Sequence, residues 1–395
     1  MSANNSPQVR SPPMGWNTWN AYSWNVTELD VRNAADALVE TGFRDAGYEY
    51  LVVDDCWMAE ELADDGSFRN HPENFPAGIA DLVDYVHDRG LKFGIYSSAG
   101  TETCAGHEAS LGNEQRHAEQ FAEWGVDYLK YDNCGDHRDR DAIDRYAAMG
   151  EALERVDRDI VYSICEWGNN EPWRWGRNVD GHLWRTTGDI LAKWKRSEDD
   201  EFGLGVVDII DEMDERDIAG YHGPNGWNDP DMLQVGNGPD SAQSQSEGFT
   251  VDQPFREAEQ RTHFSFWCLF AAPLMAGNDL RELDETTREI LLDEDAIAID
   301  QDPLGIQGTR DETDGDREVW SKRLAGGECA VILLNRGDEP VDIETSVETV
   351  DLHLPDDVGS YAVTDVWSGE EWTTDGSLEA TVDSHGVAFF RVGAA

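Results

Sequence analysis

Short apolar segments alternate with amphipathic segments from residue 12 to about residue 300. The short segments have the apolar, β-type composition of strands, and the longer ones repeat apolar residues with a helical period. Strands are predicted at residues 14–19, 48–55, 92–96, 128–134, 160–165, 181–185, 226–231 and 273–275. Eight such units predict a (β/α)8 TIM barrel, an α/β fold with a parallel sheet at its centre.

Helices are predicted between these strands, and two of them have clear end signals. Thr27 is placed as the N-cap of a helix that runs to about Thr41, and Gly90 ends the helix that begins at Ile79. Further helices are predicted at residues 113–123, 141–156, 206–213, 257–270 and 286–292. The polar stretch 238–253 lacks periodicity and is interpreted as a long loop beside the seventh strand.

The pattern changes after Gly305, where short strands are separated by Gly and Asp turns. These strands are predicted at residues 319–320, 329–334, 341–343, 352–354, 361–367 and 386–392. They are typical of a small antiparallel, β-sandwich-like domain. We therefore expect a barrel over residues 1–303 and a C-terminal antiparallel β domain over residues 304–395.

Composition adds an extreme charge to this picture, with 82 acidic residues against 30 Lys and Arg and a formal net charge of -52. A hydrophobic content of 39% is ample for a core, so the acidity does not indicate disorder. Such a surface repels nucleic acid and anionic membranes, and neither is expected as a partner. Because molar salt shortens the Debye length to roughly 3 Å and screens self-repulsion, we expect a halophilic protein that requires high salt.

The first ten residues have neither the basic nor the apolar region of a secretory signal, and no apolar run is long enough to span a membrane. We therefore expect a cytoplasmic protein. Six cysteines without CxxC spacing indicate neither a disulfide scaffold nor a structural zinc site.

Polar and aromatic residues collect where the predicted strands end. In chain order they are Trp19, Asp54, Asp55, Tyr96, Lys130, Asp132, Glu166, Trp167, Arg185, Asp189, Asp229, Asp231 and Met232. In a TIM barrel these ends converge on one mouth, where active sites lie. Carboxylates beside aromatic rings suit a sugar, which has an apolar ring face and a hydroxyl edge.

The fourth strand carries the clearest chemistry, because Tyr128, Lys130 and Asp132 share one face. A lysine can hold a neighbouring aspartate ionised and ready to attack. A structural ion pair on a surface strand would have the same spacing, so this strand alone does not decide between them.

A metal site and a phosphate site are weaker alternatives for these residues. Oxygen-only metal sites usually need tighter local loops. Only His182 among the ten histidines lies at an end of a predicted strand, where it begins the sixth strand, so no metal is expected. A phosphate site would need a glycine-rich loop after the last strands, for which Ala276-Gly-Asn-Asp279 is a poor candidate.

Seven motifs, in this order and spacing, resemble the α-galactosidases of glycoside hydrolase family 27, and the plant and microbial branch most closely. The motifs are Met14-Gly-Trp-Asn-Thr-Trp19, Val53-Asp-Asp-Cys-Trp57, Gly94-Ile-Tyr96, Tyr128-Leu-Lys-Tyr-Asp-Asn-Cys134, Cys165-Glu-Trp167, Trp184-Arg-Thr-Thr-Gly-Asp189 and Gly226-Trp-Asn-Asp-Pro-Asp-Met-Leu233. The resemblance covers nearly the whole chain and includes the C-terminal domain.

The resemblance implies a retaining α-galactosidase that works by double displacement without a cofactor. Asp132 would be the nucleophile and Asp189 the acid/base, with their carboxyl groups roughly 5–5.5 Å apart. Asp54 and Asp55 would bind the galactose 4- and 6-hydroxyls, and Lys130 would keep Asp132 ionised. The remaining expected substrate contacts are Trp19, Tyr96, Cys104, Glu166, Trp167, Arg185, Asp231 and Met232, of which Arg185 and Asp231 would hold the 2-hydroxyl side.

Other activities stay open beside this one. A related branch acts on α-N-acetylgalactosaminides and carries small residues where Glu166 and Trp167 stand here, which favours plain galactose. A β-L-arabinopyranosidase branch alters the carboxylate that contacts the 6-hydroxymethyl group, whereas Asp54 and Asp55 are both present. A transglycosylase and a catalytically inactive galactose receptor are the further alternatives, and the aglycone and the oligomeric state are not determined, a homo-oligomer included.

The chain departs from the resembled family at its cysteines and in one loop. Trp24 stands where the family often has a cysteine that pairs with the position of Cys56, so Cys56 is expected to be a free thiol. Cys104 and Cys134 match the family's other pair, but whether they are oxidised stays open. The loop 238–253 is longer than in the plant enzymes, and covering the site, an oligomer contact and an acidic insert stay open as its role.

Overall fold

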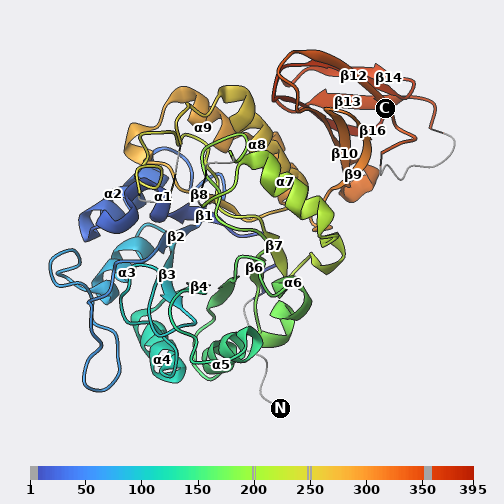
Figure 1. Ribbon diagram of the computed structural model, residues 1–395. Helices are drawn as coiled ribbons and strands as arrows, with labels where there is room; N and C mark the ends of the chain where they lie inside the picture. Colours follow the sequence, from blue (N-terminus) through green and yellow to red (C-terminus); the bar gives the residue numbers. More distant parts are fainter. Residues whose placement is uncertain (1–7, 198–199, 201, 247–248, 250, 351–357) are drawn as a thin grey trace.

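The computed structural model describes residues 8–197, 200, 202–246, 249, 251–350 and 358–395. Eight parallel strands curl into a barrel (Figure 1). They are β1 (Met14–Asn17), β2 (Tyr50–Val53), β3 (Lys92–Ser98), β4 (Tyr128–Asp132), β5 (Val161–Cys165), β6 (Leu183–Arg185), β7 (Trp227–Asp229) and β8 (Leu274–Ala276). Pairing runs from β7 through β1 to β8, and the Leu233 N–H donates to the Met275 carbonyl (2.8 Å) to join the two ends. The predicted barrel is confirmed.

Helices surround the barrel on its outer side (Figure 1). They are α1 (Trp19–Tyr22), α2 (Glu28–Glu40), α3 (Ile79–His87), α4 (Glu114–Trp124), α5 (Ala142–Glu154), α6 (Pro172–Trp175), α7 (Val206–Glu215), α8 (Glu257–Phe270), α9 (Glu285–Leu291) and α10 (Glu294–Asp300). Thr27 caps α2 as predicted, because its side chain accepts from the Asp30 N–H. Short 3-10 helices lie at Ser23–Asn25, Gly176–Val179, Ala219–Tyr221, Leu280–Glu282 and Ala325–Gly327.

The sequence prediction was wrong at the end of the first strand. The strand stops at Asn17, whose side-chain oxygen accepts from the Trp19 N–H (2.8 Å) and turns the chain into α1. The short helices α1 and α6 were not predicted, since four residues are too few to show a helical period. Helix α10 was also missed, because it follows α9 after only two residues.

The C-terminal domain consists of two antiparallel sheets. One sheet has the strand order β14-β13-β16-β11-β10-β9, and the other pairs β12 with β15. The strands are β9 (Thr309–Asp314), β10 (Arg317–Arg323), β11 (Cys329–Asn335), β12 (Val341–Ser346), β13 (Tyr361–Asp365), β14 (Glu371–Thr374), β15 (Ser377–Val382) and β16 (Val387–Ala394). β9, β14 and β15 were not predicted, because most of their residues are polar or exposed. The strand predicted at 352–354 lies outside the described residues.

The two domains meet where β10 packs on α8 (Figure 1). Trp320 on β10 contacts the rings of Phe266 and Phe270 on α8, at centroid distances of 5.3 and 6.0 Å. The buried Lys322 donates to the carbonyls of Cys268 (3.0 Å) and Ile299 (2.6 Å), near the ends of α8 and α10. The C-terminal domain therefore supplies a cation that satisfies helix carbonyls of the barrel domain.

Among the described residues, no helix combines the length and the apolar character that crossing a bilayer would need.

Candidate active site

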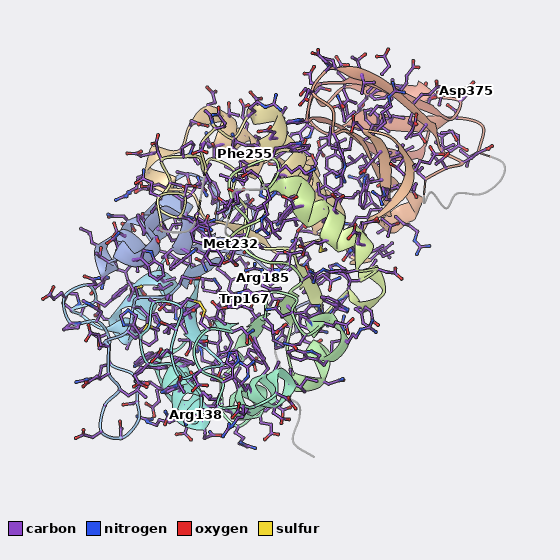
Figure 2. The ribbon with its side chains drawn as sticks, viewed as in Figure 1. Arg138, Trp167, Arg185, Met232, Phe255 and Asp375 are labelled. Atoms are coloured by element: carbon purple, nitrogen blue, oxygen red, sulfur yellow. A yellow bond between two sulfur atoms is a disulfide. The ribbon has the colours of Figure 1, made fainter. Side chains whose placement is uncertain are left out.

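The inward face of several barrel strands changes from apolar to polar toward the carboxyl end. Tyr128 and Leu183 are buried in one apolar cluster inside the barrel. Two residues further along the same strands, on the same face, are Lys130 and Arg185. Figure 2 shows Arg185 close to the middle of the barrel, with Trp167 and Met232 near it. Contacts at this mouth involve seven of the strand-end residues that the sequence predicted to converge: Asp54, Tyr96, Lys130, Asp132, Arg185, Asp189 and Asp231.

Asp132, at the end of β4, has both carboxylate oxygens engaged. The Tyr96 hydroxyl donates to Oδ2 (2.9 Å), and the Asn133 N–H donates to Oδ1 (2.9 Å). Burial raises the pKa of Asp132; Lys130 opposes this shift, and Asp189 adds to it. Burial outweighs the opposing charge of Lys130, so the expectation that Lys130 keeps Asp132 ionised stays a prediction.

The ion pair of Lys130 is made with Asp54, at 2.8 Å between Nζ and Oδ2. Burial by itself would lower the pKa of Lys130, but Asp54 and other nearby anionic groups raise it well above its usual value. Asn17 Nδ2 also donates to Asp54 Oδ2 (2.7 Å). The lysine therefore stays charged. It pairs directly with Asp54 after β2 and acts electrostatically on Asp132 at the end of β4.

Asp55 is buried and fixed by backbone donors. The Cys56 N–H donates to Oδ1 (2.7 Å), and the Ala105 N–H donates to Oδ2 (2.9 Å). Burial raises the pKa of Asp55 to about 6, although these hydrogen bonds lower it. This carboxyl group therefore changes its charge in the mildly acidic range.

Arg185 connects the carboxylates on the opposite side of the mouth. Its guanidinium pairs with Asp231 Oδ1 (2.9 Å) and with Asp189 Oδ1 (3.1 Å). Asp231 is buried, and its Oδ2 accepts from the Ile190 N–H (2.8 Å), the residue that follows Asp189. Burial raises the pKa of Asp231 against the opposing charge of Arg185. The side chain of Asp189 is 44% exposed, so this carboxyl group reaches solvent.

The aromatic and sulfur residues border the same mouth. Trp19 is half-buried and packs edge-on against Trp24, with 4.9 Å between ring centroids. Trp167 is half-buried, and its backbone has a φ of 58°, which turns the chain sharply after β5. Met232 is buried and lines a small cavity at the floor of the mouth.

Glu166 lies in the turn after β5, and it contacts that turn and Asn133, which follows β4. Its carboxylate accepts from both the backbone and the side chain of Asn170, the backbone bond being 2.9 Å, and from Asn133 Nδ2 (3.5 Å). Burial raises the pKa of Glu166. The sugar contact predicted for Glu166 stays a prediction.

Cys104 and Cys134 form a disulfide, which the sequence left open. The Cys104 sulfur lies 3.4 Å from Asp132 Oδ2 and 3.4 Å from the Tyr96 hydroxyl. The bond thus joins the loop after β3 to the end of β4, directly beside Asp132. Cys56 is a free thiol, as expected.

Sequence reasoning missed residues at the floor of the mouth. Asn17, Ser163 and Cys165 line the small cavity there together with Lys130 and Arg185. Cys165 accepts from the Arg185 guanidinium at 3.7 Å. Applying the two-residue alternation of a strand to β5 would have found both Ser163 and Cys165.

Two groups of three potential metal ligands occur among the described residues. Cys104, Asp132 and Cys134 form one group, but both of its sulfurs belong to the disulfide. Asp55, Cys56 and His107 form the other, in which the sulfur is a free thiol.

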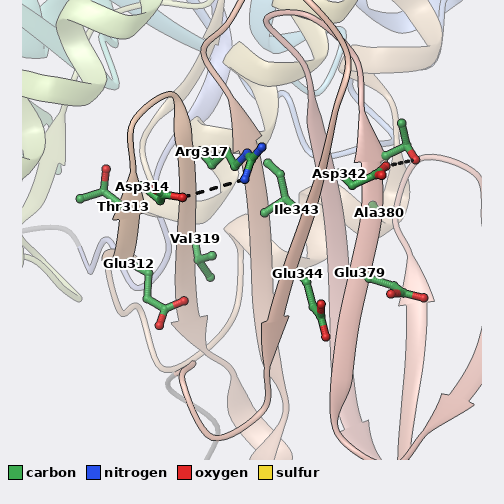
Figure 3. A pocket seen from close by; sticks show the side chains of 11 residues that line it. Glu312, Thr313, Asp314, Arg317, Val319, Asp342, Ile343, Glu344, Glu379 and Ala380 are labelled. Carbon is green, nitrogen blue, oxygen red and sulfur yellow. Dashed lines mark hydrogen bonds and ion pairs between the residues drawn. The ribbon is translucent and has the colours of Figure 1, made fainter.

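A second hollow lies between the sheets of the C-terminal domain and contains none of the predicted site residues (Figure 3). Its acidic lining includes Glu312, Glu344 and Glu379, which are solvent-exposed. Asp314 pairs with Arg317 at 3.9 Å across its edge. These groups have no catalytic arrangement, so the barrel mouth is the candidate active site.

Known α-galactosidases are similar to this chain in sequence and in structure. A family model described as Alpha galactosidase A matches residues 11–302, and one for the Alpha galactosidase C-terminal beta sandwich domain matches residues 314–392. The "Alpha-galactosidase A" of Cellvibrio japonicus is 41% identical, over 97% of this chain and 92% of that protein. The structure of alpha-galactosidase I from Mortierella vinacea has a TM-score of 0.90 at 35% identity, covering 100% of this chain and 99% of that one. An α-galactosidase from Saccharomyces cerevisiae with raffinose has a TM-score of 0.88 at 27% identity, with both chains fully covered.

Proposed function

Since the chain belongs to the α-galactosidases of glycoside hydrolase family 27, we propose that it removes terminal α-linked galactose by a retaining double displacement. Members of this family are glycoside hydrolases. The observation that carries the proposal is a pair of carboxylates with different surroundings at one mouth. Asp132 is buried and accepts from the Tyr96 hydroxyl, whereas Asp189 is exposed and pairs with Arg185. Retaining glycosidases need two carboxyl groups with two different roles.

In the first step, an oxygen of Asp132 attacks the anomeric carbon of galactose. Asp189 gives its proton to the glycosidic oxygen, so that the bond to the leaving group breaks as the bond to Asp132 forms. In the second step, the Asp189 carboxylate takes a proton from water, and the resulting hydroxide equivalent attacks the same carbon. The galactosyl bond to Asp132 breaks, and galactose leaves with its original anomeric configuration.

Sugar recognition is proposed to rest on the fixed carboxylates around this pair. Asp54 and Asp55 would accept from the 4- and 6-hydroxyls, and Lys130 would donate beside them. Asp54 is held by Lys130 and Asn17 before any sugar arrives, so its oxygen positions are set in advance. Arg185 and Asp231 would contact the 2-hydroxyl side, with Trp19, Tyr96, Trp167 and Met232 as apolar walls.

A panel of nitrophenyl glycosides tests this proposal. We expect hydrolysis of the α-galactoside, and little of the α-N-acetylgalactosaminide because Glu166 and Trp167 fill the space after β5. We also expect the β-L-arabinopyranoside to be the poorer substrate, since Asp54 and Asp55 are both present. A preference for either alternative substrate would overturn the assignment, and no hydrolysis at all would favour a galactose receptor. Product analysis at high substrate concentration separates hydrolysis from transglycosylation.

We further propose that the protein works in a salt-loaded cytoplasm. The net charge of -52 supports this, because so many like charges repel one another unless salt screens them. Activity and folding should fail as potassium chloride is lowered well below roughly molar concentration, where the Debye length grows beyond 3 Å. Unchanged activity and an unchanged unfolding temperature after desalting would contradict this.

A further inference from the structure

Asp55, Cys56 and His107 bring a carboxylate, a thiol and an imidazole together beside the mouth. The three ligand atoms all lie within 4.8 Å of one another. Asp55 and Cys56 follow β2, whereas His107 lies in the loop after β3, so two separate segments build the group. The proposed hydrolysis uses Asp55 but gives no role to Cys56 or His107, so the grouping of the three side chains needs a separate explanation.

The Cys56 thiol is buried, with 6% of the residue exposed, and its sulfur has no hydrogen-bond partner among the described residues. Trp24 stands where a pairing cysteine would be expected, so no disulfide occupies this sulfur. Burial, together with the charges of Asp55 and Asp54, raises the pKa of the thiol. An unpaired buried sulfur therefore sits next to two acidic groups.

The main chain of His107 is fixed, and its ring is available. The Thr103 N–H donates to the His107 carbonyl (2.7 Å), and the His107 N–H donates to Thr103 Oγ1 (3.2 Å). The imidazole nitrogens have no hydrogen-bond partner within the described part of the chain. Burial and the nearby His71 lower the pKa of His107, which keeps the ring in the neutral form that binds metal ions.

We propose that Asp55, Cys56 and His107 form a site for zinc or a similar borderline-soft divalent cation, and that a bound cation blocks the sugar site. Zinc is bound in proteins by cysteine sulfur, histidine nitrogen and carboxylate oxygen, and sites with three protein ligands keep a fourth position for water. Metal–ligand bonds of roughly 2.0–2.3 Å put neighbouring tetrahedral ligand atoms about 3.3–3.8 Å apart. The three atoms here are separated by at most 4.8 Å, so small side-chain movements would bring them onto one ion.

Binding replaces the thiol proton with the metal ion, so each cation bound releases one proton from Cys56 to solvent. No electron transfer is involved. The blocking effect rests on the proposed function, in which Asp55 accepts a hydrogen bond from the galactose hydroxyls. A cation that is coordinated by the Asp55 carboxylate would therefore compete with the substrate for it.

Zinc binding is measured by equilibrium dialysis of the full chain in thiol-free buffer, for the wild type and for Cys56→Ser and His107→Asn. We expect each substitution to weaken zinc binding at least about tenfold. The matched control is His87→Asn, a histidine that pairs with Asp127 outside the site. Cobalt should give the sulfur-to-metal charge-transfer absorption of a thiolate ligand, and Cys56→Ser should abolish it. Equal zinc binding by the wild type and both site variants would overturn the proposal.

Inhibition is measured in the same proteins, each relative to its own activity without zinc. Zinc should raise KM for a nitrophenyl α-galactoside in the wild type and in His87→Asn, and not in Cys56→Ser. Zinc bound through Cys56 without a rise in KM would overturn the blocking effect. A protein that binds zinc through Cys56 but hydrolyses no α-galactoside would support the site and contradict the proposed function.

Discussion

Asp132 on β4 and Asp189 after β6 face one mouth, but from opposite surroundings. Asp132 is buried and held by Tyr96 and by a backbone N–H. Asp189 is 44% exposed, and Arg185 is its ion-pair partner. A nucleophile benefits from fixed geometry and exclusion of water, whereas an acid/base must exchange a proton in each half of the reaction. The contrast therefore supports the proposed roles, with Asp132 as the nucleophile and Asp189 as the acid/base.

The largest expected effect comes from Asp132→Asn, since an amide cannot form the galactosyl bond. Turnover should fall by roughly 10⁴-fold or more for every substrate, whatever its leaving group. The measurement is steady-state hydrolysis of nitrophenyl α-galactoside and of melibiose-type disaccharides. Asp375→Asn is the control, at an exposed carboxylate of the C-terminal domain. Substantial residual turnover would remove Asp132 as the nucleophile.

Asp189→Ala should separate substrates by their leaving groups. With a dinitrophenyl α-galactoside as substrate, the leaving dinitrophenolate needs little protonation. The initial burst of dinitrophenolate should therefore remain fast. Cleavage of an α-galactosyl disaccharide should fall by about 10²–10⁴-fold, because its sugar leaving group needs the proton. Rapid-mixing measurement of the burst against steady-state disaccharide cleavage tests this. Equal losses for both substrates would contradict the acid/base role.

Lys130→Met tests the electrostatics of the Asp132 side. Lys130 lowers the pKa of Asp132, so its removal should raise that pKa and move the acid limb of the kcat/KM profile to higher pH. Asp54 would also lose its buried ion-pair partner, which costs about 3–5 kcal/mol of folding free energy. The checks are a pH–rate profile and a denaturant titration. An acid limb that stays in place would show that Lys130 does not keep Asp132 ionised.

The smallest expected effect is at His385 in the C-terminal domain, which stacks on Trp194 with ring centroids 4.5 Å apart. The Trp194 carbonyl accepts from the Val207 N–H, and the Leu204 N–H donates to the Asp189 carbonyl. The segment that contains Trp194 is therefore connected to Asp189, the proposed acid/base. His385→Ala should lower disaccharide cleavage several-fold and leave the dinitrophenyl burst unchanged. His87→Asn is the matched control, and an equal loss of both activities would indicate a purely structural role.

The sequence predicts well what depends on local pattern and on the general geometry of a barrel. Asp54, Lys130, Asp132, Arg185 and Asp231 lie toward the carboxyl ends of predicted strands, and parallel strands bring these ends together. For this reason the residues could be grouped before their contacts were known.

Partners that depend on twist and on loop paths could not be predicted in this way. Alternation places Lys130 and Asp132 on one face, but the 2.8 Å ion pair of Lys130 is with Asp54 on another strand. The Cys104–Cys134 bond spans 30 residues of sequence. It also depends on Gly100, where a Cβ would lie 2.0 Å from the Cys134 carbonyl oxygen.

The assignment of Asp132 as the nucleophile is tested most directly by trapping the covalent intermediate. A ring-fluorinated galactosyl donor with a reactive leaving group slows release of the sugar, so the galactosyl-enzyme accumulates. Mass spectrometry of the digested protein should find one added fluorogalactosyl group, on Asp132 in the peptide that contains Tyr128 and Cys134. A label on Asp189 or on another residue, or hydrolysis without any trapped adduct, would contradict the proposed double displacement through Asp132.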